Sequence, residues 1–155
     1  MLAAVKQLET ETLAGIVQAK LALAELLERL AARQLDLAQQ GELTDLIKLL
    51  AAKQTVLGQL SQIERQLDHF RSQDPESRAW RSPADRHRCQ QQARRCDELL
   101  AETMRLEKEG EVALALRRNR AAELLAQTSA AGEAQAAYAQ QPIAPSPAMH
   151  LHWEG

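Results

Sequence analysis

Two histidines and two cysteines between positions 69 and 96 are the residues best suited by type to hold a metal ion. Zinc sites are usually built from cysteine and histidine pairs spaced a few residues apart. The set contains neither a Cys-x-x-Cys nor a His-x-x-x-His pair; its members are His69, His87, Cys89 and Cys96. On a helix, His87 and Cys89 point to different sides, because residues two apart do not share a helical face. We therefore expect no metal site here.

The two cysteines are also unsuited to bonding with each other. Cys89 and Cys96 are seven residues apart, which on one helix separates them by ~10 Å of rise. We expect both to be small buried or half-buried residues of a protein from a reducing compartment. His150 and His152 near the C-terminus have a spacing that can bind metal but that often occurs by chance, and we assign them no site.

Arginines concentrate between positions 71 and 96, and such a basic segment can contact nucleic acid. Acidic residues are interleaved with them, Trp80 is the only aromatic residue in the segment, and the whole chain has a net charge of −2. We therefore interpret the segment as solvated surface or a protein-docking patch and expect no nucleic-acid partner. Its arginines are Arg71, Arg78, Arg81, Arg86, Arg88, Arg94 and Arg95.

Sequence motifs of catalysis are absent. The chain has no glycine-rich phosphate loop and no Gly-x-Ser-x-Gly nucleophile motif. Long helical bundles without an insertion rarely form the closed, water-excluding pocket that an enzyme needs. We expect no catalytic residue and no cofactor, and predict that the protein is not an enzyme.

The composition is typical of long helices. Of the 155 residues, 45% are hydrophobic but only 3% are aromatic, a bias that favours an aliphatic helical core within one domain. No stretch approaches ~20 uncharged apolar residues, and the segment from Met1 to Lys6 does not begin a signal peptide. We expect an all-α, cytoplasmic protein without membrane insertion.

A break in the apolar pattern at Gly41 predicts the topology. The spacing of three and four residues that precedes Gly41 would continue onto Thr44 and Lys48, which are not core residues. Glycine favours the left-handed conformation that often ends a helix, so we predict an αα-hairpin that reverses at Gly41. The stripe before the break is Leu13, Ile16, Leu23, Leu27, Leu30 and Leu37; the stripe after it is Leu43, Leu46, Leu50, Leu57 and Leu60.

Turn-forming residues between Arg71 and Asp85 predict the second connection. Asp74-Pro75 and Ser82-Pro83 each resemble an N-cap followed by proline at the first helical position, with a short helical turn expected around residues 76–80. The prediction is an elongated antiparallel three-helix bundle or coiled coil over residues 1–129, with helices at about 2–39, 43–70 and 83–129. Residues 130–155, with three prolines from position 142 to 147, are expected to form a flexible tail.

The stretch from Gly41-Glu42-Leu43 to Lys53-Gln54, preceded by Glu28-Arg29-Leu30 and followed by two further leucines, resembles the FlgN-type flagellar export chaperones. In that family a Gly-Asp-Leu turn leads into a helix with a Lys-Gln pair; here Glu42 replaces the aspartate. The resemblance implies a cytoplasmic type III secretion chaperone that binds hook-associated (hook-filament junction) proteins, prevents their premature assembly and delivers them to the export gate. The alternative is a structural coiled-coil adaptor or self-assembling subunit without a secretion client.

Helix lengths suggest where a client docks. At ~1.5 Å per residue the third helix is ~70 Å long and the second only ~40 Å, so part of the third helix needs another cover, either the first helix or a client. We predict the client surface at Leu106, Leu114, Leu124 and Leu125. We predict Tyr138 as the export-gate contact, the alternative being a solubilising tail. A homodimer is possible as well, because leucine seams accept domain swapping.

Overall fold

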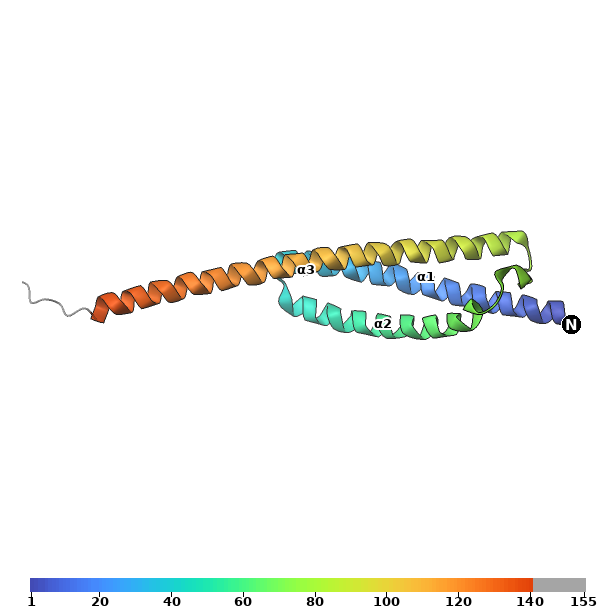
Figure 1. Ribbon diagram of the computed structural model, residues 1–155, viewed down its shortest axis with the longest axis horizontal. Helices are drawn as coiled ribbons and strands as arrows, with labels where there is room; N and C mark the ends of the chain where they lie inside the picture. The colour runs from blue at the N-terminus through green and yellow to red at the C-terminus, as the bar shows by residue number, and fades with distance from the viewer. Residues whose placement is uncertain (141–155) are drawn as a thin grey trace, which may run out of the picture. The chain divides into compact units, whose positions relative to one another are not determined.

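The computed structural model describes residues 1–140, and these form three long helices and one short 3-10 turn (Figure 1). The helices are α1 (Leu2–Gln40), α2 (Leu43–Arg71) and α3 (Pro83–Gln140), and the 3-10 turn η1 spans Pro75–Ser77. Residues 1–140 contain no strand, so the all-α, three-helix prediction is confirmed. The chain forms two compact units, of which the first is Met1–Leu114 and the second begins at Ala115.

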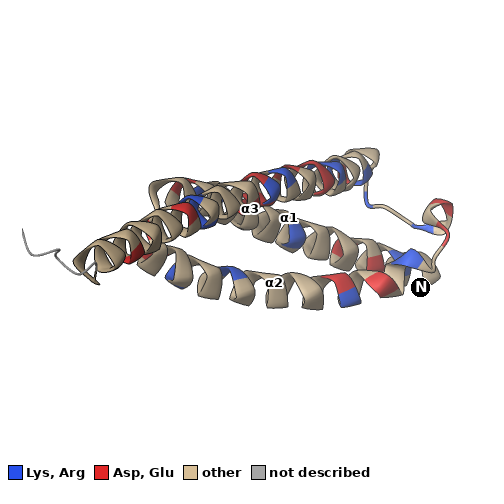
Figure 2. Ribbon diagram, turned by 60° about the vertical axis from the view of Figure 1, so that its left-hand side comes forward, with Lys and Arg blue, Asp and Glu red and all other residues tan. Residues whose placement is uncertain are grey.

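The first unit is a bundle of α1, α2 and the beginning of α3. α2 runs back alongside α1 (Figures 1 and 2). α3 is tied to both helices: Glu107 forms an ion pair with Lys53 of α2, and Gly110 lies against Gln34 of α1. The linker between α2 and α3, residues 72–82, also contacts α1, because the Thr10 hydroxyl donates to the carbonyl of Ala79 at 2.8 Å.

Gly41 makes the first reversal, as the sequence predicts. It has φ 75° and ψ 22°, the left-handed conformation that suits glycine. Gly41 is the C-cap of α1, which ends at Gln40, one residue beyond the predicted end. The N–H groups of Gly41 and Glu42 both donate to the Leu37 carbonyl, which satisfies a helix end that would otherwise lack partners. The chain can therefore turn within two residues and start α2 at Leu43.

The second connection also has the predicted caps. The Asp74 carboxylate accepts from the Glu76 N–H at 3.0 Å, and the Ser82 hydroxyl accepts from the Asp85 N–H at 3.1 Å. A side-chain acceptor at each site satisfies one of the free N–H groups of the first helical turn. The predicted turn around residues 76–80 is the shorter η1, which ends at Ser77 and leaves Trp80 to pack against the core.

The core of the first unit is aliphatic, with one phenylalanine. One buried cluster joins all three helices next to the linker, and it consists of Leu13, Val17, Leu67, Phe70 and Cys89. The predicted core stripe at the start of α2 is wrong in part: Leu46 is buried, but Leu43 and Leu50 are exposed. A helix that faces two neighbours buries one side only, and the three-four spacing alone does not say which leucines lie on that side.

The predicted boundary between helix and tail at residue 129 is also wrong, because α3 continues to Gln140. The segment from Ala130 to Gln140 is rich in alanine, the strongest helix former, and the first proline after it is Pro142. The rest of the predicted tail, with His150 and His152, lies in residues 141–155, outside the described residues.

Candidate functional site

The four leucines predicted to bind a client do not share one environment. Leu106 is only 8% exposed and belongs to the core of the bundle, so its assignment to a client surface is wrong. Its neighbour Glu107 reaches Lys53 of α2, and Gly110 contacts Gln34 of α1, so α1 and α2 both still cover α3 at this level. Leu114 is half-buried at the end of the first unit.

In the second unit, every residue of α3 from Leu116 to Gln140 is exposed. Leu124 and Leu125 are 63% and 68% exposed, and Tyr138 is 79% exposed. Leu124, Ala131 and Tyr138 are seven residues apart, so they lie along one side of this part of the helix. Tyr138 is thus held on a helix rather than on the flexible segment that the sequence suggested.

Two lysines lie in the seams of the bundle and connect different helices. Lys20 of α1 binds Glu64 of α2 at 2.7 Å. Lys53 of α2 pairs with Glu107 of α3 and also donates to the Gln34 side chain of α1 at 3.3 Å. Both lysine side chains are 13% exposed and both glutamates 34%. Such pairs favour the native register, because a shifted register separates a mostly buried charge from its partner.

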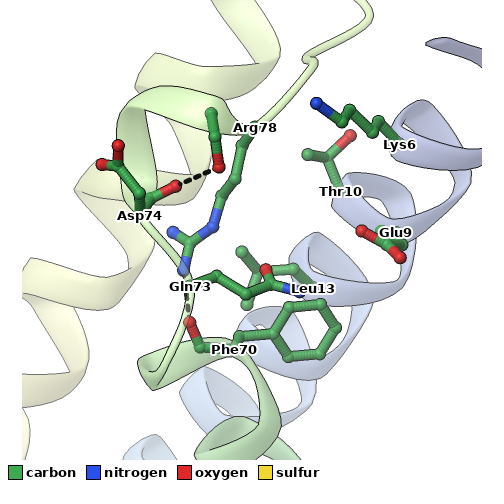
Figure 3. A pocket seen from close by; sticks show the side chains of 9 residues that line it. Lys6, Glu9, Thr10, Leu13, Phe70, Gln73, Asp74 and Arg78 are labelled. Carbon is green, nitrogen blue, oxygen red and sulfur yellow. Dashed lines mark hydrogen bonds between the residues drawn. The ribbon is translucent and has the colours of Figure 1, made fainter. Parts of the chain in front are cut away.

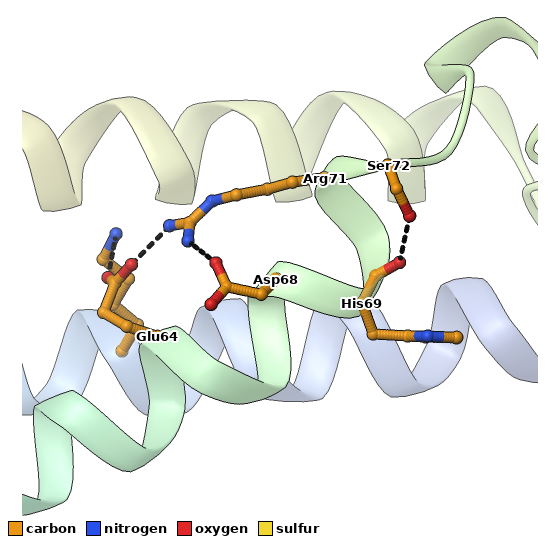
Figure 4. Close-up of polar contacts among 6 residues, drawn as sticks. Glu64, Asp68, His69, Arg71 and Ser72 are labelled. Carbon is orange, nitrogen blue, oxygen red and sulfur yellow. Dashed lines mark hydrogen bonds and ion pairs between the residues drawn. The ribbon is translucent and has the colours of Figure 1, made fainter.

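Glu64 is the centre of a small ionic network at the C-terminal end of α2 (Figure 4). Arg71, the last residue of α2, pairs with both Glu64 and Asp68, and Lys20 of α1 pairs with Glu64. Burial alone would raise the pKa of Glu64, but the hydrogen bonds and charges of Lys20 and Arg71 outweigh it and leave this pKa below its ordinary value. The same acceptors raise the pKa of Arg71, chiefly through the hydrogen bond to Glu64.

Most of the arginine-rich segment is surface that is neutralised locally. Arg86 pairs with Glu76 of η1 at 3.1 Å, and further ion pairs join Arg88 to Asp85 and Arg95 to Glu98. Arg78 differs, because it is half-buried and donates to the Phe70 carbonyl at 2.7 Å, which caps the end of α2. The local pairing fits the interpretation of solvated surface; the absence of a nucleic-acid partner stays a prediction.

An open pocket of about 230 Å³ lies between the start of α1 and the linker (Figure 3). Its charged groups balance, because Lys6 and Arg78 are matched by Glu9 and Asp74. Its hydroxyls are already engaged: Thr10 donates to backbone carbonyls, and Ser77 donates to the Asp74 carbonyl at 2.7 Å. The Nε atom of Arg78 is buried there without a hydrogen-bond partner, but one unpaired donor in an open pocket does not define a ligand site, and we assign none.

Cys89 and Cys96 are both free and buried, as the sequence predicts. Burial raises the pKa of each thiol, which disfavours the reactive thiolate. Residues 1–140 contain no cluster of three or more histidine, cysteine or acidic side chains placed to hold a metal ion. Within the same residues, none of the helices combines the length and apolar character needed to span a membrane.

In comparisons with known proteins, no family model, no curated protein and no solved structure matches the chain.

Proposed function

We propose that this protein is a cytoplasmic FlgN-type flagellar export chaperone that binds hook-associated subunits, prevents their premature assembly and delivers them to the export gate. The observation that carries the proposal is the exposed second unit, where no residue from Leu116 to Gln140 is buried although Leu124, Leu125 and Tyr138 are present. In proteins, most helical stability comes from packing of an apolar face rather than from propensity. A helix with this composition and no internal cover suits the binding of a partner.

The partner that fits best is an amphipathic helix of the client. A client helix places apolar residues against an apolar strip in the helix-in-groove mode, and Leu124 and Leu125 supply adjacent bulky anchors for it. Covering the client's own apolar face would keep it from assembling early. Because a disordered client segment loses conformational entropy on binding, the complex should be of modest affinity and open to release at the export gate.

Tyr138 supports a second, separate contact. Its ring is largely exposed near the end of α3, four helical turns from Leu124. An aromatic side chain buries a large area at a low cost in rotamer entropy, which makes it an effective anchor on a partner surface. In the proposal this side chain contacts the export machinery, while the leucines hold the client.

The client surface is tested with the double substitution Leu124→Asp and Leu125→Asp in the full chain. Binding to a C-terminal helical segment of a hook-associated subunit, measured by titration calorimetry, should weaken at least 10-fold while helicity by circular dichroism stays nearly unchanged. The matched control is Asn119→Asp, which adds a charge on the opposite side of the same exposed helix without removing an apolar side chain. Equal binding by the double variant would overturn the client surface. Failure of the wild-type chain to bind any hook-associated subunit would overturn the function itself and favour the adaptor alternative.

The delivery step is tested with Tyr138→Ala, with Tyr138→Phe as the control that keeps the ring. We expect Tyr138→Ala to bind the client normally but to lower secretion of hook-associated subunits in a flagellated host that lacks its own chaperone. Normal secretion with Tyr138→Ala would show that the ring is not the export contact.

A further inference from the structure

An uncharged stripe runs along the outer side of α2 and takes no part in the bundle. Its members recur at spacings of three and four residues, so they share one helical face, and all of them are exposed. We name this set the α2 stripe; it consists of Leu43, Ile47, Leu50, Ala51, Gln54, Gly58 and Ser61. The stripe is separate from the part of α3 that lies in the second unit, where the proposed client surface is located.

Around the C-terminal part of the stripe, the rest of the helix is almost free of charge as well. Between Leu49 and Ile63 the one charged residue is Lys53, and it is turned inward to Gln34 and Glu107. Figure 2 shows the resulting uncharged stretch in the middle of α2, in contrast to the many charged turns of α3. α3 carries surface ion pairs such as Arg105 with Glu109 and Lys108 with Glu111. A helix face that stays in water is normally polar and charged, so the α2 stripe has the character of a covered face.

Side-chain size differs between the two ends of the stripe. Its bulky aliphatic residues, Leu43, Ile47 and Leu50, lie towards the N-terminal end, and Gly58 and Ser61 at the C-terminal end are small. Gly58 is not required by the bundle, because a Cβ atom at this position would meet nothing within 4 Å. A glycine in the middle of a helix lowers helix stability, and a close approach of another backbone is one reason to find it there. Here that approach can only come from outside the chain's own bundle.

We propose that the α2 stripe binds the α2 stripe of a second copy of this chain, in an antiparallel pair with two-fold symmetry. Reversing the direction of α2 sets bulky residues against small ones at both ends, because Ile47 faces Gly58 of the second copy and Leu43 faces Ser61. Leu50 faces Gln54 near the centre of the contact. One register satisfies all three matches, because each pair is centred within half a residue of position 52. A two-fold contact uses the same patch twice, and an uncharged face meets its own copy without repulsion between like charges.

The charges at the two ends of the stripe agree with this pairing. Glu42, the N-cap of α2, directly precedes Leu43, and Arg65 follows Ser61 at a spacing of four residues. Arg65 is exposed and forms no ion pair within residues 1–140. In the antiparallel register, Glu42 of one copy lies level with Gln62 of the other, so Arg65 comes within about 5 Å of Glu42 along the helix axis. Opposite charges therefore lie near each other at both ends of the contact.

Cysteine cross-linking of the full chain tests the register. A chain with Ile47→Cys is mixed with a chain with Gly58→Cys and exposed to a mild oxidant. The mixture should form a disulfide-linked dimer, whereas each chain alone should not, because two copies of residue 47 would be ~16 Å apart at 1.5 Å per residue and beyond disulfide reach. The wild-type chain is the control, since its own two thiols are buried. Equal cross-linking by each single variant, or none in the mixture, overturns the proposed register.

Sedimentation of unmodified chains tests the association itself. The wild-type protein should be a dimer at tens of micromolar, and either Ile47→Lys or Gly58→Glu should weaken the dimer at least 10-fold with unchanged helicity. Neither position is packed within the bundle, so loss of folding is not the expected cause. Gln59→Lys, at an exposed position that is not three or four residues from any member of the stripe, is the matched control. The proposal is overturned if the wild-type protein is a monomer, or if Ile47→Lys leaves the dimer intact. It is also overturned if the stripe binds a different protein and not a second copy of this chain.

Discussion

Glu64 is a residue whose ionisation is coupled to the fold. It receives Lys20 from α1 and Arg71 from the end of its own helix, and its pKa is below the ordinary value despite some burial. A group with a lowered pKa in the folded state contributes stability above its unfolded pKa, and this contribution is lost as the pH falls through the folded pKa. The protein should therefore lose part of its stability under acid conditions through this one carboxylate.

Replacing Glu64 by glutamine should remove that part of the acid sensitivity. We expect Glu64→Gln to have a lower Tm than the wild type at pH 7, and a smaller loss of Tm between pH 6 and pH 3. Differential scanning calorimetry over this range measures both. Glu111→Gln, which alters a pair that is more than 70% exposed on both sides, is the matched control and should leave the pH profile close to that of the wild type. Parallel profiles for Glu64→Gln and wild type would contradict the assigned role.

Two glycines should respond in opposite ways to alanine. At Gly15 a Cβ atom meets nothing within 4 Å and the residue is helical, so Gly15→Ala should raise the free energy of unfolding by about 0.5–1 kcal/mol. At Gly41 the φ of 75° forces alanine into the left-handed region, so Gly41→Ala should lower it by about 1–2 kcal/mol. Urea unfolding followed by circular dichroism measures both variants. The same sign at the two sites would refute the backbone argument.

At the scale of the elements, the seam between α2 and α3 depends on Lys53. Glu107→Ala leaves the Lys53 side chain, which is only 13% exposed, without its carboxylate partner. The change should lower the free energy of unfolding by about 1–2 kcal/mol, and the cost is not larger because Glu107 itself is one-third exposed. Glu111→Ala on the same helix removes a surface pair and should cost less than about 0.5 kcal/mol. Because both changes replace glutamate by alanine in one helix, the difference isolates the seam. Equal losses in urea unfolding would mean that the pair at Lys53 contributes no more than a surface contact.

The elements themselves were largely predictable from the sequence, because their ends carry local signals. Glycine at position 41 and the Asp-Pro and Ser-Pro pairs specify caps through backbone conformation and hydrogen bonding, which depend on a few neighbouring residues. The end of α3 was less predictable, because the prolines after Gln140 favour an irregular tail, whereas the alanines before it extend the helix to Gln140.

The faces of the helices were less predictable, since burial depends on which neighbours lie where. Leu106 belongs to the same apolar pattern as Leu124, yet α1 and α2 cover only the former. Leu43 and Leu50 match the core spacing of α2, yet they lie on its exposed side. One signal in the sequence did point to that side: the absence of charge from Leu49 to Ile63 apart from Lys53. An apolar period predicts that a face is covered, but not whether the cover comes from the same chain.

At the scale of the whole molecule, the two units should differ in the protection of their backbone amides. Residues of the first unit are held by a three-helix core, whereas those from Leu116 to Gln140 are exposed along every side of α3. Local opening costs least where few apolar contacts are buried, so we expect hydrogen exchange to be at least 100-fold faster at Leu125 than at Cys96. Mass spectrometry of peptides from each unit measures this. Binding of the client should slow exchange in the second unit only, and uniform protection along α3 in the free protein would contradict the division.

The turn at Gly41 has a consequence for synthesis on the ribosome. It joins α1 and α2 through contacts that are local in sequence, so this hairpin can close in microseconds to milliseconds, while α3, 58 residues long, takes about 3–12 s to translate at ordinary rates. During those seconds, the side of α2 that carries Lys53 and neighbouring leucines is not yet covered by α3. We expect the charged amine of Lys53 to stay hydrated in this interval and to exchange water for the Glu107 carboxylate when α3 docks.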